Sequence, residues 1–389
     1  MVASPNTVVL ASEYNSVAEV VNKIFGDKYS TASVTDANRA LTHKFGWGAV
    51  NIEDALTIGT DITAERLQDL VERTNVSTDR TILPDTILIF NVPTGRTDVV
   101  KYSLIRAEDL NLVESKFNTL LINNNHLTVD AANASSLIIT PTGPAYNRTS
   151  VWQHQLNGEH KWTFNSYNHA RYFFNGGGQL RVSMNITGGS TAGYYNWSDI
   201  LNEMGQLNFT YDNVFESAAF TGGTSEGKGF YDLTENYGDG SDAGYHNEGL
   251  LYTSSGVTIS GYGYGYGYGY GYGYGGASGD YIYVDGGGSA YSGIGIGPTG
   301  YSGYSGYGGA YQSMKFKLYG KWANGGKEVH FKLVLDDTSL AQYVDGVTTA
   351  NLSLLMPDIV TYKDAEFDVN PVPTCQVTNS FNTSDDNTP

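Results

Sequence analysis

In the first third of the chain, apolar residues recur at helical spacing in three stretches. Intervals of three and four residues predict amphipathic helices over Ser12 to Phe25, Thr63 to Val71 and Glu108 to Ile122. We expect Ser12 to cap the first helix and Gly26 to end it in a left-handed conformation. Asp61 and Thr63 are the candidate caps of the second helix. Three helices of this size can pack as one small bundle.

After about Ala145 the pattern changes to short apolar or alternating runs separated by Gly, Asn and Thr, which is typical of strands and turns. One helix is expected among them, Asn196 to Met204, with Ser198 as its cap. An earlier run, Thr81 to Val92, is also strand-like but contains Pro84. The strands expected after Ala145 are Trp152 to Leu156, His160 to Phe164, Ala170 to Phe174, Gln179 to Ile186, Gln206 to Tyr211, Ser313 to Trp322 and Glu328 to Leu335.

Two glycine-containing turns predict hairpins between these strands. Asn175-Gly-Gly-Gly178 is expected to join Ala170 to Phe174 with the strand that begins at Gln179. Asn324-Gly-Gly326 is expected to join the last two strands, in which lysines alternate with Phe316, Leu318, Val329 and Phe331. That alternation indicates one face in water and one in a core.

The layout predicts an α+β protein with a small N-terminal helical domain and a mainly antiparallel, jelly-roll-like β-sandwich. We assign residues 1–145 to a helical mounting domain and residues 146–221 and 312–375 to the sandwich. Residues 222–311 are a Gly/Tyr-rich insertion, and residues 376–389 are a polar C-terminal tail.

The insertion contains the unusual composition of this chain, with 30 of its 48 glycines and 18 of its 30 tyrosines. From Gly261 to Gly275 seven Gly-Tyr pairs follow one another. As a strand, this tract would present all seven tyrosines on one face, suited to stacking on sugars or aromatic partners. A flexible low-complexity loop, an ordered glycine-rich strand and a ligand-binding surface all remain open. The candidate binding residues are Tyr262, Tyr264, Tyr266, Tyr268, Tyr270, Tyr272 and Tyr274.

Charge and cysteine content exclude several classes of protein. A formal net charge of −18 disfavours attraction to nucleic acid along the whole chain. The single cysteine, Cys375, cannot form an internal disulfide or a cysteine-based metal cluster. The first thirty residues carry no basic segment followed by an apolar run, and no stretch is apolar enough for a membrane span, so we expect no membrane insertion.

Residues that carry chemistry are few, and we predict no catalytic residue, cofactor or metal. His154, His160 and His169 are the only histidine cluster, and their spacing fits no zinc signature. Asn236 to Gly244 has oxygen ligands at alternating positions, and we interpret it as a polar turn with calcium binding as the alternative. A glycosidase-like carboxylate pair stays open among forty acidic residues.

Several segments together resemble virion structural proteins of tailed bacteriophages, especially the tail-fibre-like proteins of marine phages. The resemblance covers most of residues 8–210 and 313–356 and omits the Gly/Tyr insertion. It implies a non-enzymatic particle component whose helical domain mounts it and whose β-domain faces outward. The segments that carry it are Leu10-Ala-Ser-Glu-Tyr-Asn15, Leu56-Thr-Ile-Gly59, Ile62-Thr-Ala-Glu65, His169 to Val182, Phe331 to Asp337 and Val344-Asp-Gly-Val347.

The leading hypothesis is therefore a tail, baseplate, fibre or capsid-decorating protein, assembled in the host cytoplasm and located in the virion. Its expected partners are further copies of itself, other virion proteins and a host cell-surface glycan. The alternatives are a carbohydrate- or surface-binding adhesin, an extracellular fibre subunit whose Gly-Tyr tract packs between subunits, and a glycan-degrading enzyme.

Overall fold

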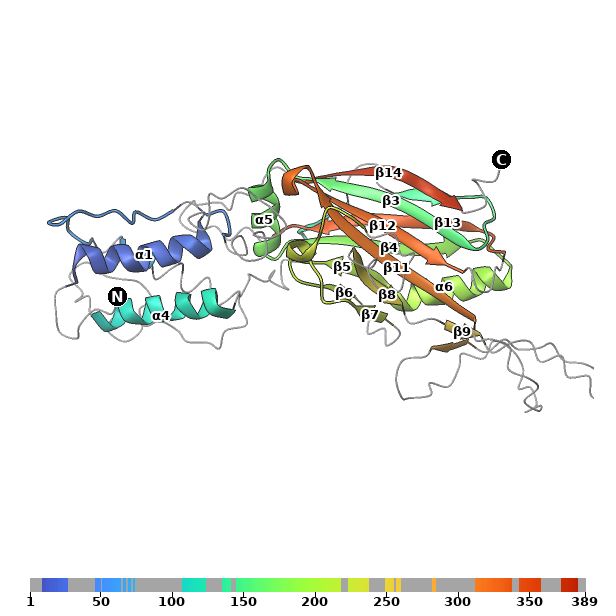
Figure 1. The fold of residues 1–389 in the computed structure, drawn as a ribbon, viewed down its shortest axis with the longest axis horizontal. Coiled ribbons are helices and arrows are strands. Elements are labelled where there is room, and N and C mark those ends of the chain that lie inside the picture. The colour runs from blue at the N-terminus through green and yellow to red at the C-terminus, as the bar shows by residue number, and fades with distance from the viewer. Residues whose placement is uncertain are drawn as a thin grey trace, which may run out of the picture.

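The computed structural model places a helical unit at one end of an elongated molecule and a β-sandwich at the other (Figure 1). The structure describes residues 9–26, 46–49, 51–63, 66–67, 69–70, 73, 107–123, 135–140, 145–217, 223–237, 249–254, 257–259, 282–284, 312–337, 343–357 and 372–383. The strand expected over Thr81 to Val92 lies outside these residues. No helix among them combines the length and the hydrophobicity that a bilayer span requires.

The helical unit contains α1 (Ala11–Phe25) and α4 (Ala107–Asn123), which pack against each other, and helical backbone also occurs between Arg66 and Arg73. These elements confirm the three expected helices. The expected caps of α1 are wrong: the Glu13 carboxylate accepts the Leu10 backbone N–H at 2.9 Å, and Gly26 has a negative φ of −92°. Ser12 lies inside the helix because the acidic side chain already satisfies the first turn.

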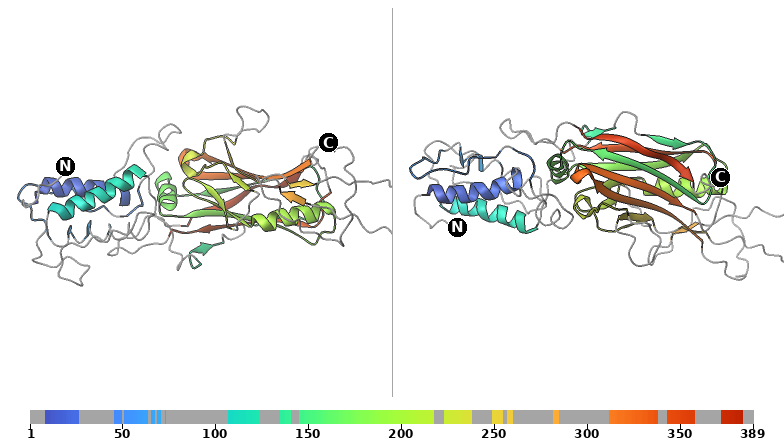
Figure 2. Two further views of the ribbon diagram at one scale, coloured as in Figure 1. Left: turned by 90° about the horizontal axis from the view of Figure 1, so that it is seen from below. Right: turned by 45° about the horizontal axis from the view of Figure 1, so that its top comes forward.

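The described strands form two antiparallel sheets that face each other across the main core, confirming an α+β fold with a β-sandwich (Figure 2). The six-stranded sheet contains β1 (Ile138–Ile139), β2 (Tyr146–Arg148), β4 (Gln179–Thr187), β5 (Gln206–Phe209), β6 (Val214–Glu216) and β13 (Val347–Leu355). The eight-stranded sheet contains β3 (Gln155–Thr163), β7 (Gly223–Ser225), β8 (Leu250–Ser254), β9 (Val257–Ile259), β10 (Ile282–Val284), β11 (Gln312–Ala323), β12 (Glu328–Asp336) and β14 (Thr374–Thr383).

The hairpin of β11 and β12 is confirmed, and its turn η2 (Asn324–Gly326) has positive φ at all three residues. Glycine accepts such angles without strain, which explains the Asn-Gly-Gly sequence. Phe316, Leu318, Val329 and Phe331 are all buried, as their alternation with lysines predicts.

The hairpin expected around Asn175 is wrong, because Tyr167–Asn175 forms helix α5 and only Gln179–Thr187 is a strand. The Ser166 hydroxyl caps α5 by accepting the His169 backbone N–H at 3.0 Å. Eight of the nine α5 residues are buried, so the helix has no polar face to reveal its period. A short run that is buried on nearly every side cannot be assigned to helix or strand by periodicity. The three glycines end this helix: the Gly178 N–H donates to the Phe173 carbonyl at 2.8 Å.

The next helix also begins earlier than expected. Helix α6 (Ala192–Met204) is capped by Thr191, whose hydroxyl accepts the Tyr194 N–H at 3.2 Å, and Ser198 lies within the helix. The first turn of α6 contains Gly193, Tyr194 and Tyr195, which have low helix propensity. The sequence pattern therefore did not show that the helix begins there.

Two predicted boundaries of the β-region are corrected as well. The expected polar tail from residue 376 is part of β14 up to Thr383, an edge strand on β3 in which only Phe381 and Thr383 are buried. Such a strand resembles a tail because nearly all its side chains meet water. Within the expected insertion, β7 and β8 belong to the eight-stranded sheet. The separate strands expected from Trp152 to Phe164 are one strand, β3.

Candidate functional site

The predicted tyrosine comb, Tyr262 to Tyr274, lies outside the described residues, but the strands on either side of it are described. Strands β9 and β10 pair antiparallel, with Ile259 opposite Ile282. The end of β9 and the start of β10 therefore lie side by side in the sheet. Ile259 also pairs with Gln312 of β11, so β11 begins at the same corner. Figure 1 shows β9 at the end of the sandwich away from α1 and α4.

Helix α5 lies between the helical unit and the sandwich and joins them (Figure 1). The fully buried Asn175 side chain donates a hydrogen bond to the Gly46 carbonyl at 2.9 Å. It accepts another from the Tyr231 hydroxyl at 2.7 Å. The segment that contains Gly46 is in turn bonded to α1, because the Trp47 N–H donates to the Ile24 carbonyl at 2.9 Å.

Apolar packing follows the same route as these hydrogen bonds. One continuous core cluster of buried residues includes Tyr14 of α1, Trp47, Phe173 of α5 and Phe331 of β12. Buried polar bonds inside a continuous apolar core hold two parts of a chain in one orientation. We call this region, Gly46–Trp47 with Arg171, Asn175 and Tyr231, the junction.

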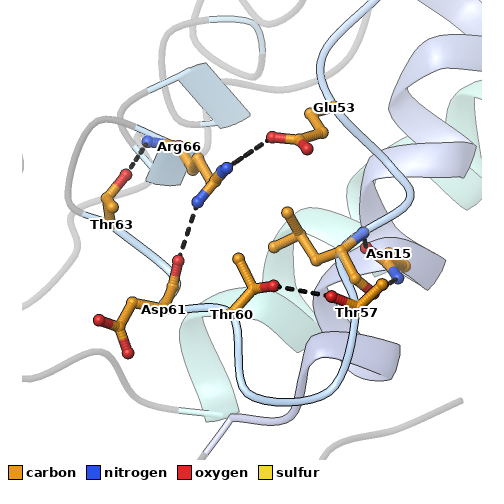
Figure 3. Close-up of polar contacts among 8 residues, drawn as sticks. Asn15, Glu53, Thr57, Thr60, Asp61, Thr63 and Arg66 are labelled. Carbon is orange, nitrogen blue, oxygen red and sulfur yellow. Dashed lines mark hydrogen bonds and ion pairs between the residues drawn. The ribbon is translucent and has the colours of Figure 1, made fainter.

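At the far end of the helical unit, polar contacts fix an exposed turn (Figure 3). The Arg66 guanidinium binds the Glu53 carboxylate at 2.6 Å and the Asp61 carbonyl at 2.9 Å. Asn15 of α1 makes two bonds of 2.9 Å with the Leu56 backbone. The following turn closes through a Thr60 N–H to Thr57 carbonyl bond at 3.0 Å.

That turn presents an apolar side chain to water. Ile58 is 102% exposed, and Gly59 behind it has φ +91°, a conformation that suits the third position of a tight turn. Of the two candidate caps of the second helix, Thr63 is confirmed, since its hydroxyl accepts the Arg66 N–H at 3.3 Å. We call Thr57–Thr60 the tip. An exposed isoleucine on a hydrogen-bonded turn is suited to fill an apolar socket on a partner, because the turn backbone loses little freedom on binding.

The three clustered histidines serve local structure instead of converging. His160 faces the core, with Nδ1 3.5 Å from the Tyr146 hydroxyl, and burial together with the nearby His330 lowers its pKa to about 3. It is therefore neutral near pH 7. His169 accepts the Asn165 N–H at the start of α5, and the His154 carbonyl accepts the Asp337 N–H. Within the described ranges, no group of three His, Cys, Asp or Glu side chains is placed to hold a metal ion.

Cys375 lies in β14 opposite Trp162 and is half-buried. Burial raises the pKa of its thiol to about 12, so the nucleophilic thiolate is not populated near neutral pH. Of the candidate calcium turn, Asn236 and Tyr237 are described and the remainder lies outside the described residues. Tyr237 packs on Leu250, Tyr319 and Val334 of the eight-stranded sheet.

The outer face of the eight-stranded sheet carries a charged cluster that the sequence pattern did not single out. The Glu328 carboxylate lies 3.0 Å from Lys161 Nζ and 2.9 Å from His330 Nε2. The hydrogen bond with His330 is the largest of the contacts that lower the Glu328 pKa. Lys161 pairs with His330 across β3 and β12, so strand register brings these groups together. No local sequence signal could have shown it.

A second polar contact was also missed. Both Asp345 oxygens accept hydrogen bonds from Ser190 and Thr191, through backbone N–H groups and hydroxyls, at 2.7 to 3.0 Å. These bonds hold the Asp345 pKa well below its usual range. They tie the loop before β13 to the first turn of α6, where an anion is also favoured by the helix dipole.

Comparison with protein-family models, curated proteins and solved structures finds no match to this chain.

Proposed function

We propose that this chain is a non-enzymatic structural protein of a tailed-phage particle, in a tail, baseplate, fibre or capsid-decorating position. The support from sequence is its resemblance to virion structural proteins over residues 8–210 and 313–356. The support from structure is the junction. Its expected partners are further copies of itself and other virion proteins.

The junction carries the proposal because a mounted component must transmit a fixed orientation from its base to its outer end. Asn175 bonds to both Gly46 and Tyr231 inside one core that runs from α1 to β12. The helical unit and the sandwich therefore act as one rod. The tip lies at one end of this rod and the corner formed by β9 lies at the other (Figure 1).

Attachment to a host surface is the second role in this proposal. The paired ends of β9 and β10 anchor both ends of residues 260–281 at the corner away from the helices. The segment between these strands contains the seven tyrosines of Gly261 to Gly275, and aromatic rings can stack on sugars. A packed contact between fibre subunits is the competing role of the same tract.

Mass spectrometry of purified particles tests the structural role. Particles from the source that encodes this chain are banded on a density gradient, and this chain is quantified against the major capsid protein of the same band. We expect a fixed copy number per particle that survives a high-salt wash. Recovery of the chain only from the soluble lysate, with capsid protein in the band, would overturn the proposal.

An activity assay tests the non-enzymatic assignment. The purified chain is incubated with host-surface polysaccharide, and reducing ends are counted over time. We expect no release above that of heat-treated protein. Release that is lost on replacing a single carboxylate would show a glycan-degrading enzyme instead.

A further inference from the structure

The outer face of the six-stranded sheet is a field of uncharged polar side chains around one arginine. Register places Arg181 of β4 between Ser353 of β13 and Asn208 of β5, with Phe215 of β6 next in the row. The adjacent row contains Asn351, Ser183 and Gln206. The remaining outward positions of β2, β4 and β13 include Asn147, Gln179, Asn185 and Thr349.

This face differs sharply in charge from the outer face of the other sheet. Among the described residues, strand register puts no carboxylate on it, although the chain as a whole has 40 acidic residues and a net charge of −18. The opposite outer face carries many charges of both signs: Lys315, Lys317, Lys321, Glu328, His330, Lys332, Asp336, Glu159 and Lys161. On the outer face of the six-stranded sheet, no carboxylate of the described strands therefore stands near Arg181 to repel an anion.

Arg181 is a half-buried cation without a counter-charge. Its Nε and Nη2 atoms donate to Gln179 Oε1 at 3.1 and 2.9 Å, and no carboxylate of the described residues pairs with it. Burial lowers the Arg181 pKa, yet a guanidinium keeps its proton at all ordinary pH values. A partly desolvated charge whose partners are all neutral is stabilised when an anion binds to it. The free edge of the guanidinium is thus suited to a ligand carboxylate.

The surrounding amides are oriented and keep unused hydrogen-bonding groups. Asn351 Nδ2 donates to Asn185 Oδ1 at 3.3 Å, and Gln206 Nε2 donates to Asn208 Oδ1 at 2.7 Å. Asn351 Oδ1 and Asn185 Nδ2 make no hydrogen bond with other described residues. The hydroxyls of Ser183 and Ser353 have no hydrogen-bond partner among the described residues. A row of fixed donors and acceptors matches the vicinal hydroxyls of a sugar.

An exposed aromatic ring completes the row. Phe215 is 40% exposed and stands beside Asn208, whose Nδ2 donates to the Phe215 carbonyl at 3.3 Å. Aromatic rings at such positions stack on the apolar face of a pyranose. A single cation could not hold a polyphosphate backbone, which binds through many neutralised charges, so nucleic acid does not fit this face.

We propose that the outer face of β13, β4, β5 and β6 binds a saccharide chain that carries carboxylates, of the uronic-acid class. Arg181 binds one sugar carboxylate, the amides and serine hydroxyls bind ring hydroxyls, and Phe215 stacks on the neighbouring ring. This site is separate from the tyrosine tract. It does not depend on the particle role, although it would supply the glycan contact of that role.

Binding of a short oligogalacturonate, measured by calorimetry at low salt, tests the proposal. The matched ligand is the same oligomer with its carboxylates methyl-esterified, which keeps the hydroxyls and removes the charge. We expect wild-type protein to bind the acid form at least about tenfold more tightly than the ester. The Arg181→Gln variant should lose this preference, whereas Lys332→Gln, which removes one positive charge from the opposite face, should keep it.

A second variant covers the case in which Arg181→Gln does not fold. Asn351→Asp introduces a carboxylate at an exposed position of the same face and should abolish binding of the acid form by repulsion. Equal binding of acid and ester forms, equal losses in Arg181→Gln and Lys332→Gln, or no binding by wild type would each overturn the proposal. Particle mass spectrometry is independent of this assay, so failure of one leaves the other assignment standing.

Discussion

Asn175 and Gly46 are 129 positions apart in sequence, and their 2.9 Å hydrogen bond joins the helical unit to the sandwich in a site without water access. Replacing Asn175 with Leu removes both buried hydrogen bonds, the one to the Gly46 carbonyl and the one from the Tyr231 hydroxyl. We expect a loss of roughly 2–6 kcal/mol in unfolding free energy, because removing a buried hydrogen-bond partner costs about 1–3 kcal/mol for each of the two bonds. Urea unfolding followed by circular dichroism measures it.

Hydrogen exchange distinguishes a loosened junction from general destabilisation. In Asn175→Leu, the amides of Trp47 and Ala49, which bond to the end of α1, should exchange faster, while those of β11 and β12 keep their protection. Asn382→Ala, at an exposed position of β14, is the matched control and should leave both sets unchanged. Uniformly faster exchange over the whole chain would contradict a specific junction.

Asp345 predicts a pH dependence of stability that its amide variant lacks. Its folded pKa is depressed by bonds from Ser190 and Thr191, so its contribution is complete above the unfolded value, about 3.9. The contribution is lost as pH falls from there toward the folded pKa. Urea midpoints of wild type and Asp345→Asn should therefore differ at neutral pH and converge in strong acid. A constant difference at every pH would show that the carboxylate charge is not what matters.

Adding a side chain at Gly158 of β3 should cause a packing defect. A Cβ built there would lie 2.5 Å from the Tyr146 ring and 2.8 Å from the Phe381 ring. These rings pack on each other with centroids 4.6 Å apart, so neither can move freely. Gly158→Ala should cost about 1–3 kcal/mol, as overpacking of a core does. Phe381→Ala opens the space, so the double variant should be more stable than the sum of the single effects, measured by a urea cycle. Additive effects of the two substitutions on the unfolding free energy would show that the strain does not lie between residues 158 and 381.

The sequence pattern predicted elements whose two faces meet different surroundings and missed those whose faces meet the same one. In the β11–β12 hairpin, Phe316 and Leu318 are buried while Lys315 and Lys317 are not, so the alternation was visible. Helix α5 is buried on nearly every side, and most of β14 is exposed. Neither segment therefore shows a periodic alternation of apolar and polar residues in the sequence. In β4, polar residues around Arg181 alternate with buried apolar residues, so the sequence showed which residues share its outer face. Its neighbours Ser353 and Asn208 come from distant strands, and sequence spacing could not place them there.

A substitution of Ile58 at the tip should affect assembly without affecting the fold. Ile58 is fully exposed, so Ile58→Ser should change unfolding free energy by no more than about 0.5 kcal/mol. If the helical unit mounts the protein, the same change should lower its copy number per purified particle, measured by quantitative mass spectrometry. Val151→Ser, 52% exposed on the sandwich, is the control and should be incorporated as wild type. Normal incorporation of Ile58→Ser would show that the mounting contact does not lie at the tip.

Deletion of Gly261 to Gly275 separates the roles of the tyrosine tract. Seven residues would remain between β9 and β10, enough to close an antiparallel hairpin, so the sandwich should keep its stability and β9 its pairing with β11. Under the attachment role, the variant should enter particles normally and lose adsorption to host cells, counted by plaque adsorption. Replacing the seven tyrosines with serine at full length is the matched control for loop length. Loss of adsorption in both variants assigns it to the aromatic rings, whereas normal adsorption in both would make the tract a spacer, and loss of self-assembly would make it a contact between subunits.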